Sequence, residues 1–287
     1  MTVFRDARHI VTADVSTMTR EDLVEAMTGE AVLAQTDLRP PVPSTPDVVL
    51  RVHELTGRGF DDLSFQAHAH EIVGLAGSGG SRKYEIANAI VGLDRPFSGS
   101  VTVGHTALGD GNVLGALRAG VGFTPQDRHE SGFVPGLGIG ENLTMTVPHR
   151  LGRRGVVRPG RREEFARSLI AELDVVPAEP GYPVGQLSGG NQQKVVAGRA
   201  IADTPRLLVL MAPTAGVDVK SRTSLMDTAV RSAERGAAVL VVTDDLDDLR
   251  YCHRVLVLHR GRIVTELHDS WTDQQVVAAM EGMTASE

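Results

Sequence analysis

Short apolar runs alternate with amphipathic segments along the chain after residue 47, and this alternation limits the possible folds more than any other feature. The runs have the length of strands, and the segments between them have the length and periodicity of helices. Buried strands separated by helices form a mostly parallel sheet that is covered on both faces. The pattern therefore predicts an α/β domain with strands at residues 48–52, 71–76, 206–211, 237–243 and 254–259 and helices at residues 81–91, 161–173, 190–202 and 221–235.

The composition excludes several classes of protein. Of the 287 residues, 41% are hydrophobic and 4% are aromatic, which is ordinary for a soluble α/β protein. The longest apolar runs, at residues 207–212 and 237–242, are too short to span a membrane, and the N-terminus contains no apolar signal-peptide core. A net charge of −7 argues against nucleic acid as a partner. Cys252 is the one cysteine, so an internal disulfide is excluded and we expect a packing residue.

A proline-rich linker separates the main domain from a short repeat. Residues 39–46 contain four prolines, which forbid both a helix and a central strand. Residues 3–12 and 19–27 resemble residues 257–265 and 272–280, so a strand–turn–helix unit occurs twice, unless the similarity arose by chance. We therefore expect the tail of a preceding, similar domain at residues 1–30, a linker at 31–46 and the main domain at 47–284.

A glycine-rich turn connects the predicted strand at residues 71–76 to a helix. In such turns the backbone N–H groups converge on phosphates, but the usual motif continues Gly-Lys-Ser or Gly-Lys-Thr, and Gly80 occupies the lysine position. The point charge that steadies the β- and γ-phosphates is therefore missing. Arg82 and Lys83 lie further along the predicted helix, where we expect them to point elsewhere. The backbone could still bind nucleotide through Gly77, Ser78, Gly79, Gly80 and Ser81.

A second motif opens the predicted helix at residues 190–202. Residues 187–194 are Leu-Ser-Gly-Gly-Asn-Gln-Gln-Lys, and we expect Ser188 and the amides of Gly189 and Gly190 to cap a helix whose N-terminus is partially positive. An ordinary serine cap is the alternative. Leu-Ser-Gly-Gly-any-Gln is the signature of ATP-binding cassettes, and the chain resembles this family over residues 48–283. In the family the signature, here including Gln192, meets the γ-phosphate of ATP held by the opposite cassette.

The resemblance implies the ABC-type P-loop fold, with a mostly parallel core sheet, an antiparallel β subdomain and a helical signature subdomain at about residues 126–203. Residues 207–218 are similar to the family's Walker B strand and D-loop, where Asp-Glu precedes Pro-Thr. Met211 replaces the aspartate that orders Mg²⁺, and a thioether is a poor ligand for that ion. Ala212 replaces the catalytic glutamate, so nothing there polarises water. Asp218 matches the D-loop residue that reaches the partner.

Two further family positions can be compared. Residues 121–126 resemble the strand into the Q-loop, where Gln126 would sense Mg²⁺ and couple to the membrane subunit. Ser81 and Gln126 are thus the weak metal ligands that the resemblance leaves. Asp244 occupies the switch position, where the family has histidine, and its negative charge would repel a γ-phosphate.

The resemblance implies the second, degenerate cassette of a ribose- or galactose-type sugar importer. Four departures fall on catalytic positions, so its own site would bind ATP, with Mg²⁺ weak or absent, and not hydrolyse it. Its signature would complete the ATP site of a catalytically competent second cassette. Both would lie at the cytoplasmic face of the membrane beside permease subunits, with a solute-binding protein as an indirect partner. The alternatives are an active ATPase with displaced groups, such as Lys83 or Asp245, and a regulatory cassette outside transport.

Overall fold

The computed structural model describes residues 1–5, 8–14, 17, 18, 26, 39–109, 111–153, 156–268 and 271–283. The chain forms two compact units, Met1–Leu38 and Arg39–Glu287. In the first unit, strands β1 (Thr2–Arg5) and β2 (Arg8–Thr12) pair as an antiparallel hairpin. Apart from Ala26, the helix predicted at residues 19–27 lies outside the described residues.

A six-stranded sheet forms the centre of the second unit, in the order β14-β13-β5-β12-β11-β8. The five strands from β13 to β8 are parallel, and β14 is antiparallel to β13. Every residue of β5, β11 and β12 is buried, as expected for strands covered on both faces. The strands are β5 (Ile72–Gly77), β8 (Val121–Thr124), β11 (Leu207–Met211), β12 (Ala238–Thr243), β13 (Arg254–His259) and β14 (Arg262–His268).

A separate antiparallel sheet contains the first predicted strand of the main domain. Its order is β4-β3-β6-β7, and β3 extends five residues beyond the predicted end at residue 52. Buried and exposed residues alternate along β3 and β4, because only one face of this sheet packs against the rest of the unit. The strands are β3 (Val48–Gly57), β4 (Phe60–His68), β6 (Ser98–Val103) and β7 (Thr106–Ala107).

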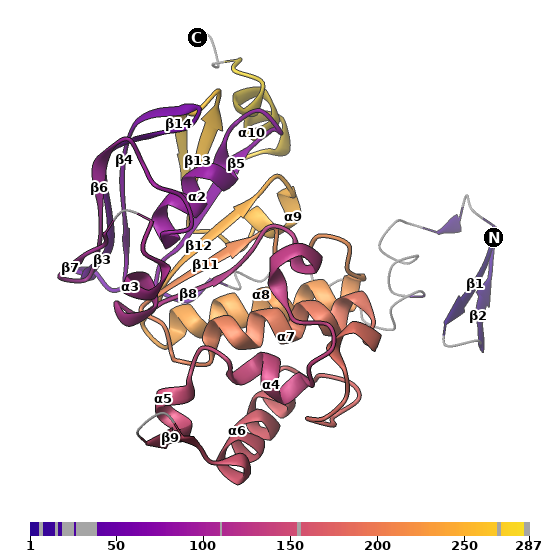
Figure 1. The fold of residues 1–287 in the computed structure, drawn as a ribbon. Coiled ribbons are helices and arrows are strands. Elements are labelled where there is room, and N and C mark those ends of the chain that lie inside the picture. The colour runs from indigo at the N-terminus through magenta and orange to yellow at the C-terminus, as the bar shows by residue number, and fades with distance from the viewer. Residues whose placement is uncertain are drawn as a thin grey trace. The chain divides into compact units, whose positions relative to one another are not determined.

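The helices surround the central sheet and form a projection between β8 and β11 (Figure 1). Helix α2 contacts β3, β5, β11 and β12, so it lies between the two sheets, whereas α7 packs against α4 and α8. The elements are α2 (Lys83–Val91), α3 (Val113–Arg118), η2 (Arg128–Gly132), α4 (Ile139–Thr144), α5 (Pro148–Leu151), β9 (Gly152–Arg153), β10 (Val156–Val157), α6 (Pro159–Glu172), η3 (Val184–Gln186), α7 (Gly189–Ile201), α8 (Val219–Glu234), α9 (Leu246–Leu249) and α10 (Asp273–Met280).

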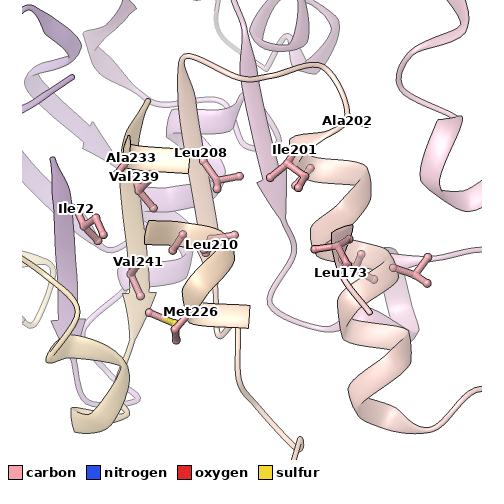
Figure 2. Close-up of a cluster of buried hydrophobic side chains, with 14 of the residues drawn as sticks. Ile72, Leu173, Ile201, Ala202, Leu208, Leu210, Met226, Ala233, Val239 and Val241 are labelled. Carbon is pink, nitrogen blue, oxygen red and sulfur yellow. The ribbon is translucent and has the colours of Figure 1, made fainter. Parts of the chain in front are cut away.

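Two apolar clusters cover opposite faces of the central sheet, because successive side chains of a strand point to opposite sides. One cluster contains Leu208 and Leu210 of β11 and packs them against Met226 of α8 (Figure 2). The other contains Met211 and the buried face of α2. Cys252 is 1% exposed and, as predicted, serves as a packing residue. Among the described residues, no helix is both long enough and apolar enough to cross a membrane.

These features confirm the predicted fold class: a mostly parallel core sheet, an antiparallel β subdomain and a helical subdomain. The predicted helices at residues 161–173, 190–202 and 221–235 correspond closely to α6, α7 and α8. The first helix is different, since α2 begins at Lys83 and not at Ser81. This difference of two residues changes the interpretation of the glycine-rich loop.

Candidate nucleotide site

The central strands bring the predicted site residues to one edge of the sheet. β5, β12 and β11 are parallel neighbours, and their carboxyl ends are Gly77, Thr243 and Met211. In open α/β sheets, ligands bind outside the carboxyl ends of the strands, where loops lead into helices. The glycine-rich loop, the segment after β11 and Asp244 therefore lie on the same edge.

The loop after β5 contains two unlike kinds of glycine. A Cβ on Gly77 would lie 2.4 Å from the Ser81 Cβ and 2.8 Å from the Leu258 carbonyl oxygen, so only glycine fits there. At Gly79 and Gly80, by contrast, a Cβ would have no described atom within 4 Å. The Ser81 N–H donates to the Ser78 carbonyl oxygen (3.0 Å) and closes a tight turn. The loop therefore has its outer backbone accessible and its inner end tightly packed.

Lys83 does not point away from this loop, so that expectation was wrong. Its side chain is 2% exposed, and its Nζ donates to the Gly77 carbonyl oxygen (2.8 Å). Nζ also lies 3.7 Å from Asp244 Oδ2, across the sheet edge. The error came from counting the phosphate-loop pattern from Gly74; counted from Gly77, the pattern places its lysine at residue 83, with Arg82 in place of the second glycine. Because α2 begins at Lys83, this lysine is the first residue of the helix and can reach back into the loop.

Arg82 does point away, as predicted. Its backbone is left-handed, with φ at 67°, and this conformation turns the chain from the loop into α2. Its Nη1 donates to Glu85 Oε1 (2.8 Å) and its side chain lies beside Gly59. The Arg82 guanidinium therefore pairs with Glu85 and lies toward the antiparallel sheet, away from the glycine-rich loop.

The end of β11 does not fit a magnesium site. Met211 is fully buried in an apolar cluster, and its N–H donates to Thr124 Oγ1 (3.1 Å). Ala212 has a left-handed backbone with φ at 45°, and its N–H donates to the Val242 carbonyl oxygen (2.8 Å). A buried thioether and a methyl group offer no oxygen to a hard divalent cation.

An acidic cluster beside this edge was missed by the sequence analysis. Asp248 is completely buried, and both of its carboxylate oxygens accept hydrogen bonds from Thr214 Oγ1 (2.9 and 2.7 Å). Burial raises the pKa of Asp248 to about 6, although the Thr214 hydroxyl opposes the shift. Because Thr243 Oγ1 also donates to Asp248 (3.3 Å), this carboxyl joins the loops that follow β11 and β12.

Asp245, the alternative general base considered from the sequence, is held in an ion pair. Its Oδ2 forms an ion pair with Arg222 Nη2 at 2.7 Å. Burial alone would raise the pKa of Asp245, but the Arg222 hydrogen bond and backbone N–H groups outweigh it and lower the pKa. A carboxylate with a lowered pKa and a fixed cation is a weak general base.

The signature lies at the N-terminus of α7, as predicted, but its capping differs from the prediction. Ser188 occupies the N-cap position without a capping hydrogen bond from its side chain. Its Oγ instead accepts a hydrogen bond from Asn191 Nδ2 (3.0 Å), because Asn191 is held in turn by the Val176 N–H (2.8 Å). Ser188 is exposed and Gly189 half-buried, so this helix end is accessible.

The rest of the signature faces inward. Gln192 is 7% exposed and its Nε2 donates to the Val184 carbonyl oxygen (3.4 Å), so it holds the segment that precedes the helix. A Cβ on Gly190 would lie 2.2 Å from Ser221 Oγ on α8. Asp218 caps α8 by accepting from the Ser221 N–H (2.9 Å). The Asp218 carboxylate thus stabilises the start of α8 within this chain.

The loop after β8 reaches the signature through Arg128. Its Nη1 donates to the Ala215 carbonyl oxygen (2.8 Å), and its Nη2 would lie 3.1 Å from a Cβ on Gly189. Gln126 is exposed at the start of the same loop. Nothing in the sequence indicated that Arg128 contacts the segment after β11.

These features define an ATP-binding cassette, with a glycine-rich loop between a central strand and a helix, a signature helix, and two sheets around a buried helix. The ABC transporter family matches at residues 60–215, and the chain belongs to that family.

Relatives and solved structures are similar over most of the chain. The ribose import ATP-binding protein RbsA of Rhodococcus jostii is 36% identical over 292 residues, which cover 100% of this chain and 57% of that protein. The xylose import ATP-binding protein XylG of Burkholderia cenocepacia is 34% identical over 291 residues, covering 97% and 56%. The dimeric bacterial ABC transporter cassette MJ0796 has a similar fold, with a TM-score of 0.68, 24% identity, and coverage of 78% of this chain and 100% of that chain. The chain thus spans little more than half the length of these curated relatives.

Proposed function

We propose that the chain is an ATP-binding subunit of a sugar importer, and that it binds ATP at its own loop without hydrolysing it. The relatives named for ribose and xylose import support the class of solute. The observation that carries the proposal is the contrast between an accessible signature helix and a β11 end occupied by Met211 and Ala212. Hydrolysis needs a group that polarises water, and neither side chain can do so. Mg²⁺ would bind weakly or not at all, with Ser81 and Gln126 as neutral oxygen donors.

The signature would act on ATP held by a second, catalytically competent cassette. At the N-terminus of α7, the Ser188 hydroxyl, the Gly189 amide and the helix dipole face outward. Arg128 adds a positive charge beside them. A triphosphate held by a partner would fit this electropositive surface. The head-to-tail pair would then contain one hydrolytic site and one binding site.

A groove supports docking to a permease. It lies between α3, β8 and the segment around α5, and its side chains are mainly apolar. Leu114, at the rim of the groove, is 64% exposed. A single exposed leucine is common, but this one adjoins other apolar residues of the groove. A cytoplasmic segment of a permease subunit is the proposed occupant, which would place the chain at the cytoplasmic face of the membrane. The extracytoplasmic solute-binding protein would be an indirect partner. The lining includes Leu93, Leu114, Leu117, Phe123, Pro125 and Pro148.

The first unit would be the tail of a preceding cassette. The β1–β2 hairpin has a register shift between Val3 and Phe4, and the β13–β14 hairpin has one between Val257 and Leu258. These positions correspond in the sequence repeat, so the two hairpins share a detail of backbone geometry. The domain limits of 1–30, 31–46 and 47–284 are part of this proposal.

A reconstituted complex tests these proposals. The chain would be purified alone and then with the neighbouring cassette and permease, and ATP turnover would be measured in each case. We expect turnover in the complex and none from the chain alone. Replacing the P-loop lysine of the partner cassette should abolish turnover, whereas turnover that survives would contradict an inactive site in this chain.

Copurification tests the permease contact separately. Leu114→Asp should release the permease, while Val277→Asp, at a position on α10 that is 47% exposed, should not. Failure of the unmodified chain to recover a membrane subunit would favour a regulatory cassette.

A further inference from the structure

We propose that Arg128 contacts the γ-phosphate of ATP held by a second cassette, so that this chain contributes a cation as well as its signature to the partner's site. The inference rests on the proposed role of the signature toward a partner. It assigns a task to a side chain that is distant from the signature in the sequence and lies beside it in the structure.

Arg128 reaches the signature from the loop after β8. It is the first residue of η2, which contacts α7. A Cβ on Gly189 would lie 3.1 Å from Arg128 Nη2, and one on Gly216 would lie 3.5 Å from the same atom. The guanidinium is therefore a neighbour of both the first turn of α7 and the segment after β11.

The hydrogen-bonding capacity of Arg128 is largely unused within the described part of the chain. A guanidinium has five N–H donors. Nη1 donates to the Ala215 carbonyl oxygen (2.8 Å), whereas the Nε–H is buried and has no partner among the described residues. Buried polar groups are normally hydrogen-bonded, so this incomplete pairing points to an acceptor that the chain itself does not supply.

The charge of Arg128 also lacks a counterion among the described residues. Asp127, the adjacent carboxylate, accepts from two backbone N–H groups within η2 (2.7 and 3.3 Å). Asp218, near the first turn of α7, accepts from the N–H and the hydroxyl of Ser221 (2.9 and 2.8 Å). Both nearby carboxylates are thus turned to other donors, and the guanidinium keeps its net charge.

This location is unfavourable for a cation unless an anion joins it. The N-terminus of a helix has a partial positive charge, so cationic side chains stabilise the opposite end. Arg128 nevertheless lies beside Gly189, the first residue of α7, and the preceding Ser188 is exposed. Hydroxyl, helix end and guanidinium are together the donors that bind phosphate. A phosphate supplied by a partner would remove the repulsion between helix and cation.

The chemistry of arginine indicates which phosphate is contacted. Its planar fork matches two phosphate oxygens, and a guanidinium supplied from another subunit can stabilise the charge that develops on a transferred phosphoryl group. The signature is proposed to meet the γ-phosphate, and Arg128 lies beside the signature. Since ADP lacks this phosphate, the contact would distinguish ATP from ADP at the partner's site. An arginine that served only to hold the Ala215 carbonyl group would not.

The test measures association of the full chain with the second cassette, whose catalytic glutamate is replaced so that ATP is not hydrolysed. The affinity of the pair is determined by analytical ultracentrifugation in ATP and in ADP. We expect Arg128→Gln, which removes the charge and keeps an N–H donor, to weaken association in ATP by about tenfold or more, a loss of ~1.4 kcal/mol per tenfold. Association in ADP should be unchanged. Arg128→Lys keeps the charge and should associate more tightly in ATP than Arg128→Gln.

A matched control removes an arginine elsewhere. Arg167 on α6 has an exposed side chain that pairs with Glu163, so Arg167→Gln should leave association unchanged in both nucleotides. The partner's turnover at saturating ATP, measured in the complex with permease, should fall for Arg128→Gln and not for Arg167→Gln.

The outcomes separate this inference from the proposed function. If the unmodified chain associates equally in ATP and ADP, the proposed composite site is wrong and the inference falls with it. If ATP strengthens association and Arg128→Gln responds to ATP equally, the composite site stands and the inference is wrong. Equal weakening of Arg128→Gln in both nucleotides would show a structural role and would also overturn it. Arg128→Lys provides an answer even if Arg128→Gln does not fold, because loss of the ATP effect in a variant that keeps the charge would contradict the proposal.

Discussion

The glycines of the phosphate loop and those of the signature helix α7 differ in how closely neighbouring atoms pack around them. Gly79 and Gly80 face open space, and a side chain at either position would contact no described atom. On α7, a Cβ on Gly190 would lie 2.2 Å from Ser221 Oγ, and one on Gly198 would lie 2.5 Å from Leu143 Cδ2. The fold itself therefore requires glycine at positions 190 and 198 of α7, whereas the glycines at the tip of the loop are not required by packing.

This difference decides how strongly a substitution in each motif would disturb the fold. A side chain at Gly79 or Gly80 would extend into open space and disturb little of the core. A change at Gly190 or Gln192 would disturb the contact of α7 with α8 or with the segment before it. Persistence of the signature is therefore not by itself proof of function, and experiments must separate its packing role from its role toward a partner.

The largest expected effect is on turnover in the assembled complex. Gly189→Asp places a negative charge at the α7 N-terminus, where it would oppose a γ-phosphate. Loss of one well-placed donor in comparable sites costs about 10²–10³ in rate, and we expect a decrease of that order in the partner's ATP hydrolysis. The fold should survive, since an acidic residue at a helix N-terminus is stabilising and Arg128 lies nearby.

Gly80→Asp is the matched control for this charge. It adds the same carboxylate to the other motif, where it would weaken ATP binding at a site that is proposed not to hydrolyse ATP, so turnover in the complex should fall less than in Gly189→Asp. Equal losses for the two variants, measured at saturating ATP, would remove the functional contrast between the regions.

The second prediction concerns the pH dependence of stability and involves Asp248, which lies beside the carboxyl ends of β11 and β12. The pKa of Asp248 is raised to about 6 in the folded chain, so the unfolded chain loses this proton at lower pH. Asp248 therefore leaves the free energy of unfolding highest below the unfolded pKa and lowers it as pH rises from about 4 to about 6. The cost at pH 7 is on the order of 2–3 kcal/mol.

Asp248→Asn measures that cost directly. The free energy of unfolding of the variant, relative to the unmodified chain, should rise between pH 4 and pH 6 and level off above pH 6, as followed by urea denaturation. Asp245, Arg222 and the two threonines facing Asp248 are retained, so the difference isolates one carboxyl group. A difference that does not vary with pH would contradict the raised pKa.

The sequence predicted the features that depend on apolar pattern and missed those that depend on local backbone geometry. The central strands were recognisable because continuous apolar runs leave few alternatives. The start of α2 was placed at Ser81 from motif spacing, and nothing in the letters reveals that Arg82 adopts a left-handed conformation. The burial of Asp248 was equally hidden, because a run of acidic residues resembles a solvated loop. The orientation of Lys83 and the burial of Asp248 became apparent only from their contacts.

The third prediction tests packing directly at the two kinds of glycine. Gly190→Ala should reduce the free energy of unfolding by about 1–3 kcal/mol, because the added methyl group displaces Ser221 and the α8 cap. Gly79→Ala should be neutral or stabilise by up to about 1 kcal/mol, since its φ is not left-handed and the unfolded chain loses freedom. Chemical denaturation of both variants measures the difference, and equal stabilities would contradict the packing argument.

The smallest effect should occur at Ala212, where the phosphate side contains backbone strain. An L-residue in the left-handed region costs about 1–2 kcal/mol, which glycine avoids, although glycine also loses more conformational freedom on folding. Ala212→Gly should therefore stabilise the chain by a net ~0.5–1 kcal/mol. Ala171→Gly, at an exposed position in α6, should destabilise by about 1 kcal/mol, because its backbone is helical. A gain in the free energy of unfolding for Ala212→Gly together with a loss for Ala171→Gly would show that neighbouring residues impose the conformation at Ala212. A loss for both variants would mean that the strain is absent.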